Sequence, residues 1–197
     1  MINVLQEIKI IIFDNMENIK FEELRYPIGK FELPSSISED QIAEWIGVLE
    51  HFPARLEALV KELSATQLET RYRPGGWTVR QLIHHVADSH HNSYIRFKWA
   101  LTEETPVIKP YHEKKWAELF DARTAPVELS LNHLSAVHAK LVYLLKGLNS
   151  EDLKLTFIPP ESIEPTSIEE NIGRYVWHGN HHNAHIKHLV IREGWNS

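Results

Sequence analysis

Residues 167–192 read SIEENIGRYVWHGNHHNAHIKHLVIR, and this stretch decides how the rest of the chain is interpreted. Ser167 followed by Glu170 forms a capping box, a pattern that begins many helices. Apolar residues then recur at helical spacing as far as Leu189. Gly194 is a typical residue just beyond a helix end. The stretch therefore predicts one long amphipathic helix.

The same helix carries five of the 13 histidines of the chain. Because residues four apart on a helix lie on one face, it offers two stacked pairs, His178/His182 and His181/His185. Neutral imidazole is a common ligand for zinc, nickel and iron. The spacing alone does not choose between the two pairs.

Residues 78–91 read TVRQLIHHVADSHH and hold four more histidines. Thr78 followed by Gln81 is a second capping box, so a helix is expected to begin there. His84 and His85 point about 100° apart on that helix, so at most one of them can face a shared site. A stacked pair from one helix and one imidazole from another would make a three-histidine site with an open position, which is typical of catalytic metals.

Two further long helices complete the pattern, and strand evidence is thin. We expect the long helices at about Glu39 to Leu63, Thr78 to Leu101, Val127 to Lys146, and Ser167 to Arg192. Pro53 should kink or break the first of them. The loop over residues 102–125 is longer than a bundle needs, and residues 113–120 could form a short helix within it. The fold class predicted from this pattern is an all-α four-helix bundle.

Composition excludes several classes of function. Among 197 residues, 43% are hydrophobic, 24% are charged, and the net charge is -6. Because no run of Lys and Arg stands out, we expect no nucleic-acid partner. The absence of cysteine excludes disulfides, thiolate metal sites and a cysteine nucleophile, and it fits a cytoplasmic location. The apolar run at residues 8–13 is too short to span a membrane, so we expect no membrane association.

The chain divides at about residue 20. Glu7 and Asp14 flank the apolar run closely, and Met16 offers a second possible start. We interpret residues 1–20 as an N-terminal extension that is either not native or poorly ordered. Residues 21–197 are expected to form a single domain.

Four motifs are specific enough to compare with known families. They are YPIG at residues 26–29, GGWTVRQ at 75–81, HHVADSH at 84–90 and YVWH at 175–178. Together they resemble the DinB-like superfamily, specifically its YfiT branch, and the resemblance extends from about Tyr26 to Trp195. It implies an up-down-down-up four-helix bundle with long connecting loops, assembled as a homodimer.

The resemblance also implies a ligand set. In that family one histidine of the second helix and a stacked pair of the fourth hold a metal. Carried onto this sequence, these positions are His85, His181 and His185. We expect one divalent ion per chain, zinc or nickel. Asp88 and His178 are expected to contact and orient the ligands.

Three functions stay open from the sequence. The favoured one transfers a low-molecular-weight thiol of the bacillithiol type to an electrophile, with the metal deprotonating the thiol. The second is a hydrolase that attacks a small ester or amide with metal-bound hydroxide. The third is a non-catalytic bundle that the metal only stabilises. His90 and His133 are expected to matter little for metal binding.

Overall fold

A computed structural model describes residues 21–160 and 162–195, and the predicted extension at residues 1–20 lies outside the described residues. Four long helices dominate: α2 (Glu39–Val60), α4 (Val79–Ala100), α7 (Val127–Lys146) and α8 (Ile168–Arg192). The connections contain the short helices α3 (Ala65–Leu68), α5 (Glu113–Trp116) and α6 (Phe120–Thr124), and the 3₁₀ turn η1 (Asp152–Lys154). Two short antiparallel strands, β1 (Thr156–Phe157) and β2 (Thr166–Ser167), precede α8.

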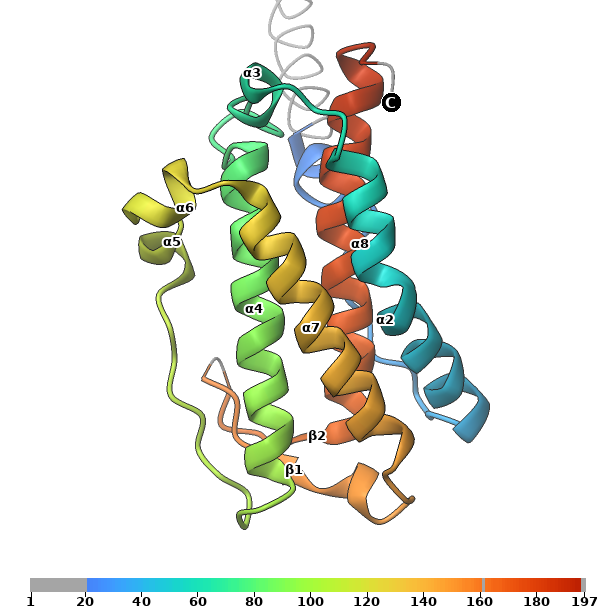
Figure 1. The fold of residues 1–197 in the computed structure, drawn as a ribbon. Coiled ribbons are helices and arrows are strands. Elements are labelled where there is room, and N and C mark those ends of the chain that lie inside the picture. The colour runs from blue at the N-terminus through green and yellow to red at the C-terminus, as the bar shows by residue number, and fades with distance from the viewer. Residues whose placement is uncertain (1–20, 161, 196–197) are drawn as a thin grey trace, which may run out of the picture.

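The four long helices form a bundle in which α2 and α8 run in one direction and α4 and α7 in the other (Figure 1). Helices α2 and α4 each pack against both α7 and α8. The long connection between α4 and α7 returns along the bundle, which allows these two neighbours to run in the same direction. The predicted all-α, up-down-down-up four-helix bundle is confirmed.

The two predicted capping boxes fix where the histidine-bearing helices begin. The backbone N–H of Gln81 donates to the Thr78 hydroxyl at 3.2 Å, and that of Glu170 donates to the Ser167 hydroxyl at 3.2 Å. The Gln81 and Glu170 side chains accept from the cap residues in return. These caps therefore fix the residues at which α4 and α8 begin.

Helix α2 continues through Pro53 and is not broken there. A proline has no backbone N–H, so the carbonyl four residues earlier loses its helical donor. That carbonyl belongs to Leu49, and it accepts a hydrogen bond from Nδ1 of His138 on α7 at 2.7 Å. A side chain of a neighbouring helix thus replaces the bond that Pro53 removes.

Two hydrophobic clusters fill the bundle. One joins α2, α4 and α8 around Phe52, Leu82 and Ile186, and the other lies nearer the strands around Phe97 and Ile172. Seven histidines are buried beside these clusters: His84, His85, His90, His138, His181, His182 and His185. Buried imidazoles are costly unless their nitrogens have partners, so this concentration calls for a function.

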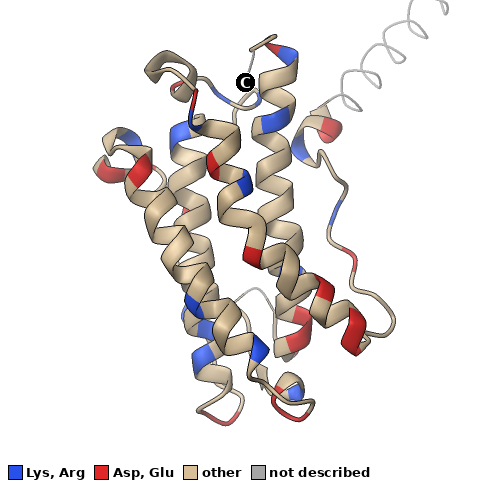
Figure 2. Cartoon of the chain, turned by 45° about the vertical axis from the view of Figure 1, so that its right-hand side comes forward, with Lys and Arg blue, Asp and Glu red and all other residues tan. Residues whose placement is uncertain are grey.

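Positive and negative side chains are mixed over this bundle. Lys, Arg, Asp and Glu are interspersed along the helices and their connections (Figure 2). Among the described residues, no helix combines the length and the apolar character needed to cross a membrane.

The long connection after α4 positions one wall of the site. Its first part is held by backbone hydrogen bonds between Ile108 and Ile158 at 3.0 Å and between Ile158 and Pro106 at 2.9 Å. It then forms α5 and α6, where the sequence predicted one short helix. Gln81 of α4 donates to the carbonyl of Ala117 at 2.7 Å, which ties the end of α5 to the bundle.

Candidate metal centre

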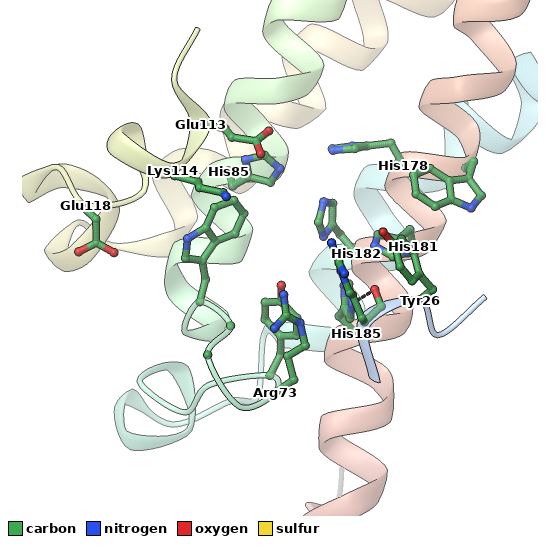
Figure 3. Close-up of a pocket in the computed structure, with 16 residues that line it drawn as sticks. Tyr26, Arg73, His85, Glu113, Lys114, Glu118, His178, His181, His182 and His185 are labelled. Atoms are coloured by element: carbon green, nitrogen blue, oxygen red, sulfur yellow. Dashed lines mark hydrogen bonds between the residues drawn. The ribbon is translucent and has the colours of Figure 1, made fainter. Parts of the chain in front are cut away.

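A cavity of about 650 Å³ opens between α4 and α8, beside the segment that precedes α2 (Figure 3). Its volume is within the ~300–1,000 Å³ typical of small-molecule sites. His85 of α4 lines one side, and four of the five histidines of α8 line the other: His178, His181, His182 and His185. The remaining wall comes from α5 and from the turn that precedes α4. The cavity therefore collects histidines from both of the helices that the sequence singled out.

Two sets of histidines within the described residues bring their ring nitrogens together. His85, His178 and His182 form the first group, and His181, His182 and His185 form the second. Within each group, one nitrogen per histidine lies within 4.8 Å of the others. The first group joins two helices, whereas the second lies wholly on α8. His182 belongs to both, so the two groups are adjoining parts of one site.

The predicted ligand set, His85, His181 and His185, is neither of these groups. The structure brings His181 and His185 together with His182, and it places His85 in the other group. The stacked pair His178/His182, which the spacing left open, is the pair that meets His85. The set His85, His181 and His185 therefore stays a prediction. The ring positions support the alternative in which His85 joins the pair His178/His182.

The first group is made of neutral imidazoles. Burial lowers the pKa of His85 to about 4. Burial, and then the neighbouring His85, holds the pKa of His178 well below its ordinary value. The pKa of His182 is lowered in the same direction, by burial and then by His178. At neutral pH each ring therefore keeps a lone pair, which is the form that binds a cation.

The nitrogens of the first group also fit a divalent ion. Nδ1 of His182 is buried and has no hydrogen-bond partner among the described residues. Nε2 of His178 lies 3.4 Å from the Ser89 hydroxyl, a long contact. The other nitrogen of His178, Nδ1, lies 3.2 Å from Nε2 of His90. Three uncharged donors that lack strong partners suit a cation with room for a further ligand.

The second group has a different environment. Nε2 of His185 donates to the backbone carbonyl of Arg25 at 3.2 Å (dashed in Figure 3), so only its Nδ1 retains a lone pair. The ring of His181 stacks on Trp177, with 4.5 Å between the centroids. Burial and then the Arg73 guanidinium lower the pKa of His181 to about 4. A cation at this group would lie near a positive charge.

Comparison with known proteins agrees with this architecture. The model of the DinB superfamily matches residues 49–186. The chain belongs to the DinB superfamily. It is 50% identical over 172 residues to the Bacillus subtilis (strain 168) protein named "Putative metal-dependent hydrolase YfiT", which covers 87% of this chain and 97% of that protein. A Bacillus cereus (strain 03BB102) protein with the description "Putative metal-dependent hydrolase" is 53% identical over 173 residues, 88% of this chain and 99% of that one.

A solved structure extends the similarity to three dimensions. YfiT from Bacillus subtilis, described as a probable metal-dependent hydrolase with an unusual four-helix bundle topology, matches with a TM-score of 0.86. The sequences are 49% identical, and the match covers 88% of this chain and 99% of that chain. The predicted membership of the YfiT branch of the DinB superfamily is confirmed.

Neither Asp88 nor His178 is placed as expected of a residue that only orients the metal ligands. His178 lies among the possible ligands themselves. No hydrogen bond joins the Asp88 carboxylate to a described histidine, and Asp88 is not part of the cavity wall. Burial, and then the charge of Asp121, raises the pKa of Asp88 to about 6. The orienting role of Asp88 therefore has no geometric support.

Sequence reasoning missed the polar side chains that complete the wall of the cavity. They are Arg73, Glu113, Lys114 and Glu118, which come from the turn before α4 and from the α5 region. Residues on such connections have no helical periodicity to reveal their direction. Only the length of the 102–125 loop indicated that this region carries function.

Proposed function

We propose that this chain is a metal-dependent hydrolase of small substrates, and that His85, His178 and His182 hold one divalent ion. The observation that supports the proposal most directly is the convergence of three neutral imidazoles, from two helices, beside a cavity of about 650 Å³. The names of the Bacillus relatives point to the same chemistry. Hydrolysis therefore takes first place over thiol transfer, which the sequence alone had favoured.

Three features favour this group over His181, His182 and His185. Its donors approach from α4 and α8, so they can surround an ion from two sides. No backbone carbonyl of the described residues occupies a nitrogen of His178, whereas the carbonyl of Arg25 occupies Nε2 of His185. Burial and other histidines are the main causes that lower the pKa of His178, with Arg96 acting after them, whereas Arg73 is the largest cause after burial for His181.

A divalent ion in this group would lower the pKa of a bound water from ~15.7 toward ~7. The residues of the chain supply the remaining functions. Among the described residues, no carboxylate pairs with Arg73, and its Nε is buried without a partner. Nη1 of Arg73 donates to the carbonyl of Pro74 at 3.1 Å, so Nε is the donor left to stabilise the negative charge that develops on a carbonyl oxygen during attack. Glu113 and Glu118 are carboxylates of the same wall that can accept and return a proton.

The rest of the wall selects the substrate. Trp77 and Trp177 give the cavity aromatic surfaces, and Arg25, Arg73 and Lys114 give it cationic ones. This combination suits a small ester or amide with an apolar part and a carboxylate. The same cationic surfaces could hold the carboxylate of a low-molecular-weight thiol, which keeps thiol transfer as the second candidate.

One experiment separates the two candidates. Protein loaded with zinc, nickel or cobalt is incubated in ¹⁸O-labelled water with a panel of small esters and amides, and in parallel with thiols and a monohalobimane. Hydrolysis predicts label in the released acid and no need for thiol. A thioether product that depends on metal would replace hydrolysis with transfer. Turnover that survives exhaustive chelation would overturn both, and absence of turnover with tight metal binding would favour a bundle that the metal only stabilises.

The expected homodimer is also a proposal. Light scattering of the metal-loaded chain should give a mass of about twice the 23.0 kDa of one chain. A mass of 23.0 kDa at assay concentration would contradict it.

A further inference from the structure

A row of three histidines leads from the proposed metal site into the interior of the bundle. Nδ1 of His178 lies 3.2 Å from Nε2 of His90, and Nδ1 of His90 lies 2.9 Å from Nε2 of His138. Nδ1 of His138 then lies 2.7 Å from the carbonyl oxygen of Leu49. The side chains of His90 and His138 are 0% and 1% exposed, and neither lines the cavity.

The direction of every hydrogen bond in this row follows from its last member. A carbonyl oxygen can only accept, so Nδ1 of His138 must carry the hydrogen. A neutral imidazole has one N–H, so Nε2 of His138 accepts, and Nδ1 of His90 must be its donor. By the same argument Nε2 of His90 accepts from Nδ1 of His178. Nε2 of His178 is then left with its lone pair, and its nearest polar neighbour is the Ser89 hydroxyl in a long contact of 3.4 Å.

Two features keep the row in this order. Pro53 removes the helical donor for the Leu49 carbonyl, so this acceptor depends on His138. The rings also have little freedom to turn, because Phe52 stacks on His90 at 5.3 Å and Tyr175 meets His90 edge-on at 5.1 Å. Burial lowers the pKa of His138 to about 4, in agreement with a neutral ring.

We propose that His90 and His138 are positioning residues that fix the tautomer and orientation of His178, so that its Nε2 is presented to the metal. The proposal rests on the proposed metal site, because it assigns His178 as a ligand. It gives a role to two residues that do not line the cavity, and for His90 it replaces the expectation that this residue matters little for metal binding. A partner that holds the far nitrogen of a ligand histidine also restricts rotation of its ring.

A second histidine pair between the same helices supplies the matched control. His91 of α4 and His133 of α7 also approach to 2.9 Å, and their rings stack. His133 is exposed, and neither residue of the pair has a hydrogen bond to the site among the described residues. Substitution of His133 removes an imidazole from α7 without interrupting the row.

The first test is the tautomeric state of the wild-type, metal-free chain. In ¹⁵N-histidine NMR spectra at neutral pH, the proposal predicts that His90, His138 and His178 all carry hydrogen on Nδ1 and a lone pair on Nε2. If any of the three carries its hydrogen on Nε2 instead, the proposal is overturned whether or not the chain binds metal. If the tautomers are as expected but His178→Ala binds metal normally, the proposed metal site fails and the orienting role fails with it.

The second test measures how tightly the folded variants bind Co²⁺ in competition with a chelator, together with the visible spectrum of the bound ion. His138→Phe leaves His90 without its acceptor, so we expect affinity to fall about 10-fold and the spectrum to change. His133→Phe should match wild type in both. His138→Gln keeps a donor and an acceptor, and it should recover most of the affinity. Equal binding by His138→Phe and His133→Phe would overturn the proposal, as would an unrecovered loss in a folded His138→Gln.

Discussion

The two histidine groups of the cavity share one residue and one helix, yet they are held in different ways. The first group spans α4 and α8, and its His178 is joined through buried histidines to the carbonyl of Leu49 on α2. The second lies on α8 alone, and its His185 is joined to the backbone of Arg25, in the segment that precedes α2. One group is therefore anchored in the bundle and the other in a connecting segment.

This difference teaches that proximity of imidazoles is a weak guide to a metal ligand. Both groups pass the same distance criterion. They differ in which nitrogen is left free and in how strongly a guanidinium acts on them. Arg73 is the largest cause after burial that lowers the pKa of His181, whereas Arg96 acts on His178 only after burial and two histidines. A preorganised donor set binds a cation at less cost where the nearby positive charge acts less strongly.

His182→Ala should have the largest effect, because His182 belongs to both groups. We expect metal content after dialysis to fall from about one ion per chain to near zero, a loss greater than the ~10–100-fold that removal of an outer contact costs. Elemental analysis gives the stoichiometry, and circular dichroism checks that the bundle persists. Retention of one ion per chain would exclude both groups.

The contrast between His178→Ala and His181→Ala tests the comparison directly. If the first group holds the ion, His178→Ala should lower affinity more than about 100-fold, and His181→Ala should change it only a few-fold. Chelator competition measures both. The reverse result would favour either the second group or the predicted set of His85, His181 and His185. His85→Ala then separates these two, because it should lose metal if the predicted set holds the ion and keep it if the second group does.

The four-helix architecture could be predicted from the sequence. Which histidines of α8 point toward α4 could not. The capping boxes at Thr78 and Ser167 marked where α4 and α8 begin, so the helices that carry the site were predicted correctly. The spacing left the choice between His178/His182 and His181/His185 open, and only the family resemblance selected His181/His185, because the choice depends on how α8 is rotated against α4. That rotation is set by packing on all sides of α8, which its own sequence does not contain.

Two features of the sequence indicated the buried row of His178, His90 and His138, although neither was used to predict it. His138 is on the apolar stripe of α7 between Leu134 and Leu141, and a polar residue on a buried face needs a partner. Pro53 in α2 indicated a carbonyl without a donor. Neither sequence feature says that the two meet, because they are 85 residues apart, and only the packing of α2 against α7 brings them together.

The stability of the metal-free chain should fall in mild acid. The pKa values of His85 and His138 are about 4 in the folded chain, against an ordinary value of 6.5. The unfolded chain therefore binds protons first as the pH falls, so stability is complete above about pH 6.5 and is lost toward pH 4. Each of these residues should account for on the order of 3 kcal/mol over that range. Thermal melts between pH 7 and pH 4 measure the slope.

His138→Phe provides the internal control for this pH effect. It removes one of the contributing groups, so its melting temperature should depend less steeply on pH than that of wild type. A slope equal to that of wild type would show that the buried row does not hold its histidines neutral.

Gly179→Ala and Gly47→Ala should give the smallest effects, and of opposite sign. Gly179 is next to His178, and an added Cβ would lie 3.1 Å from the ring of Phe52, which stacks on His90. Phe52 is 1% exposed and has little room to move, so overpacking should cost about 1–3 kcal/mol. The better helix propensity of alanine offsets about 0.5–1 kcal/mol of that cost. Gly47 of α2 has nothing within 4 Å of an added Cβ, so there the propensity gain should appear alone.

The same two variants also test the metal site, through the rise in melting temperature that metal binding produces. A shift of the Phe52 ring would displace His90, which contacts His178, so Gly179→Ala should also reduce this rise. Gly47→Ala should leave the rise unchanged, because an added Cβ at Gly47 meets no described atom within 4 Å and so exerts no strain on the buried row. Gly179→Ala could instead lower the melting temperature of the metal-free and metal-loaded forms equally. That result would show that packing around Phe52 stabilises the bundle but does not help His90 to orient His178.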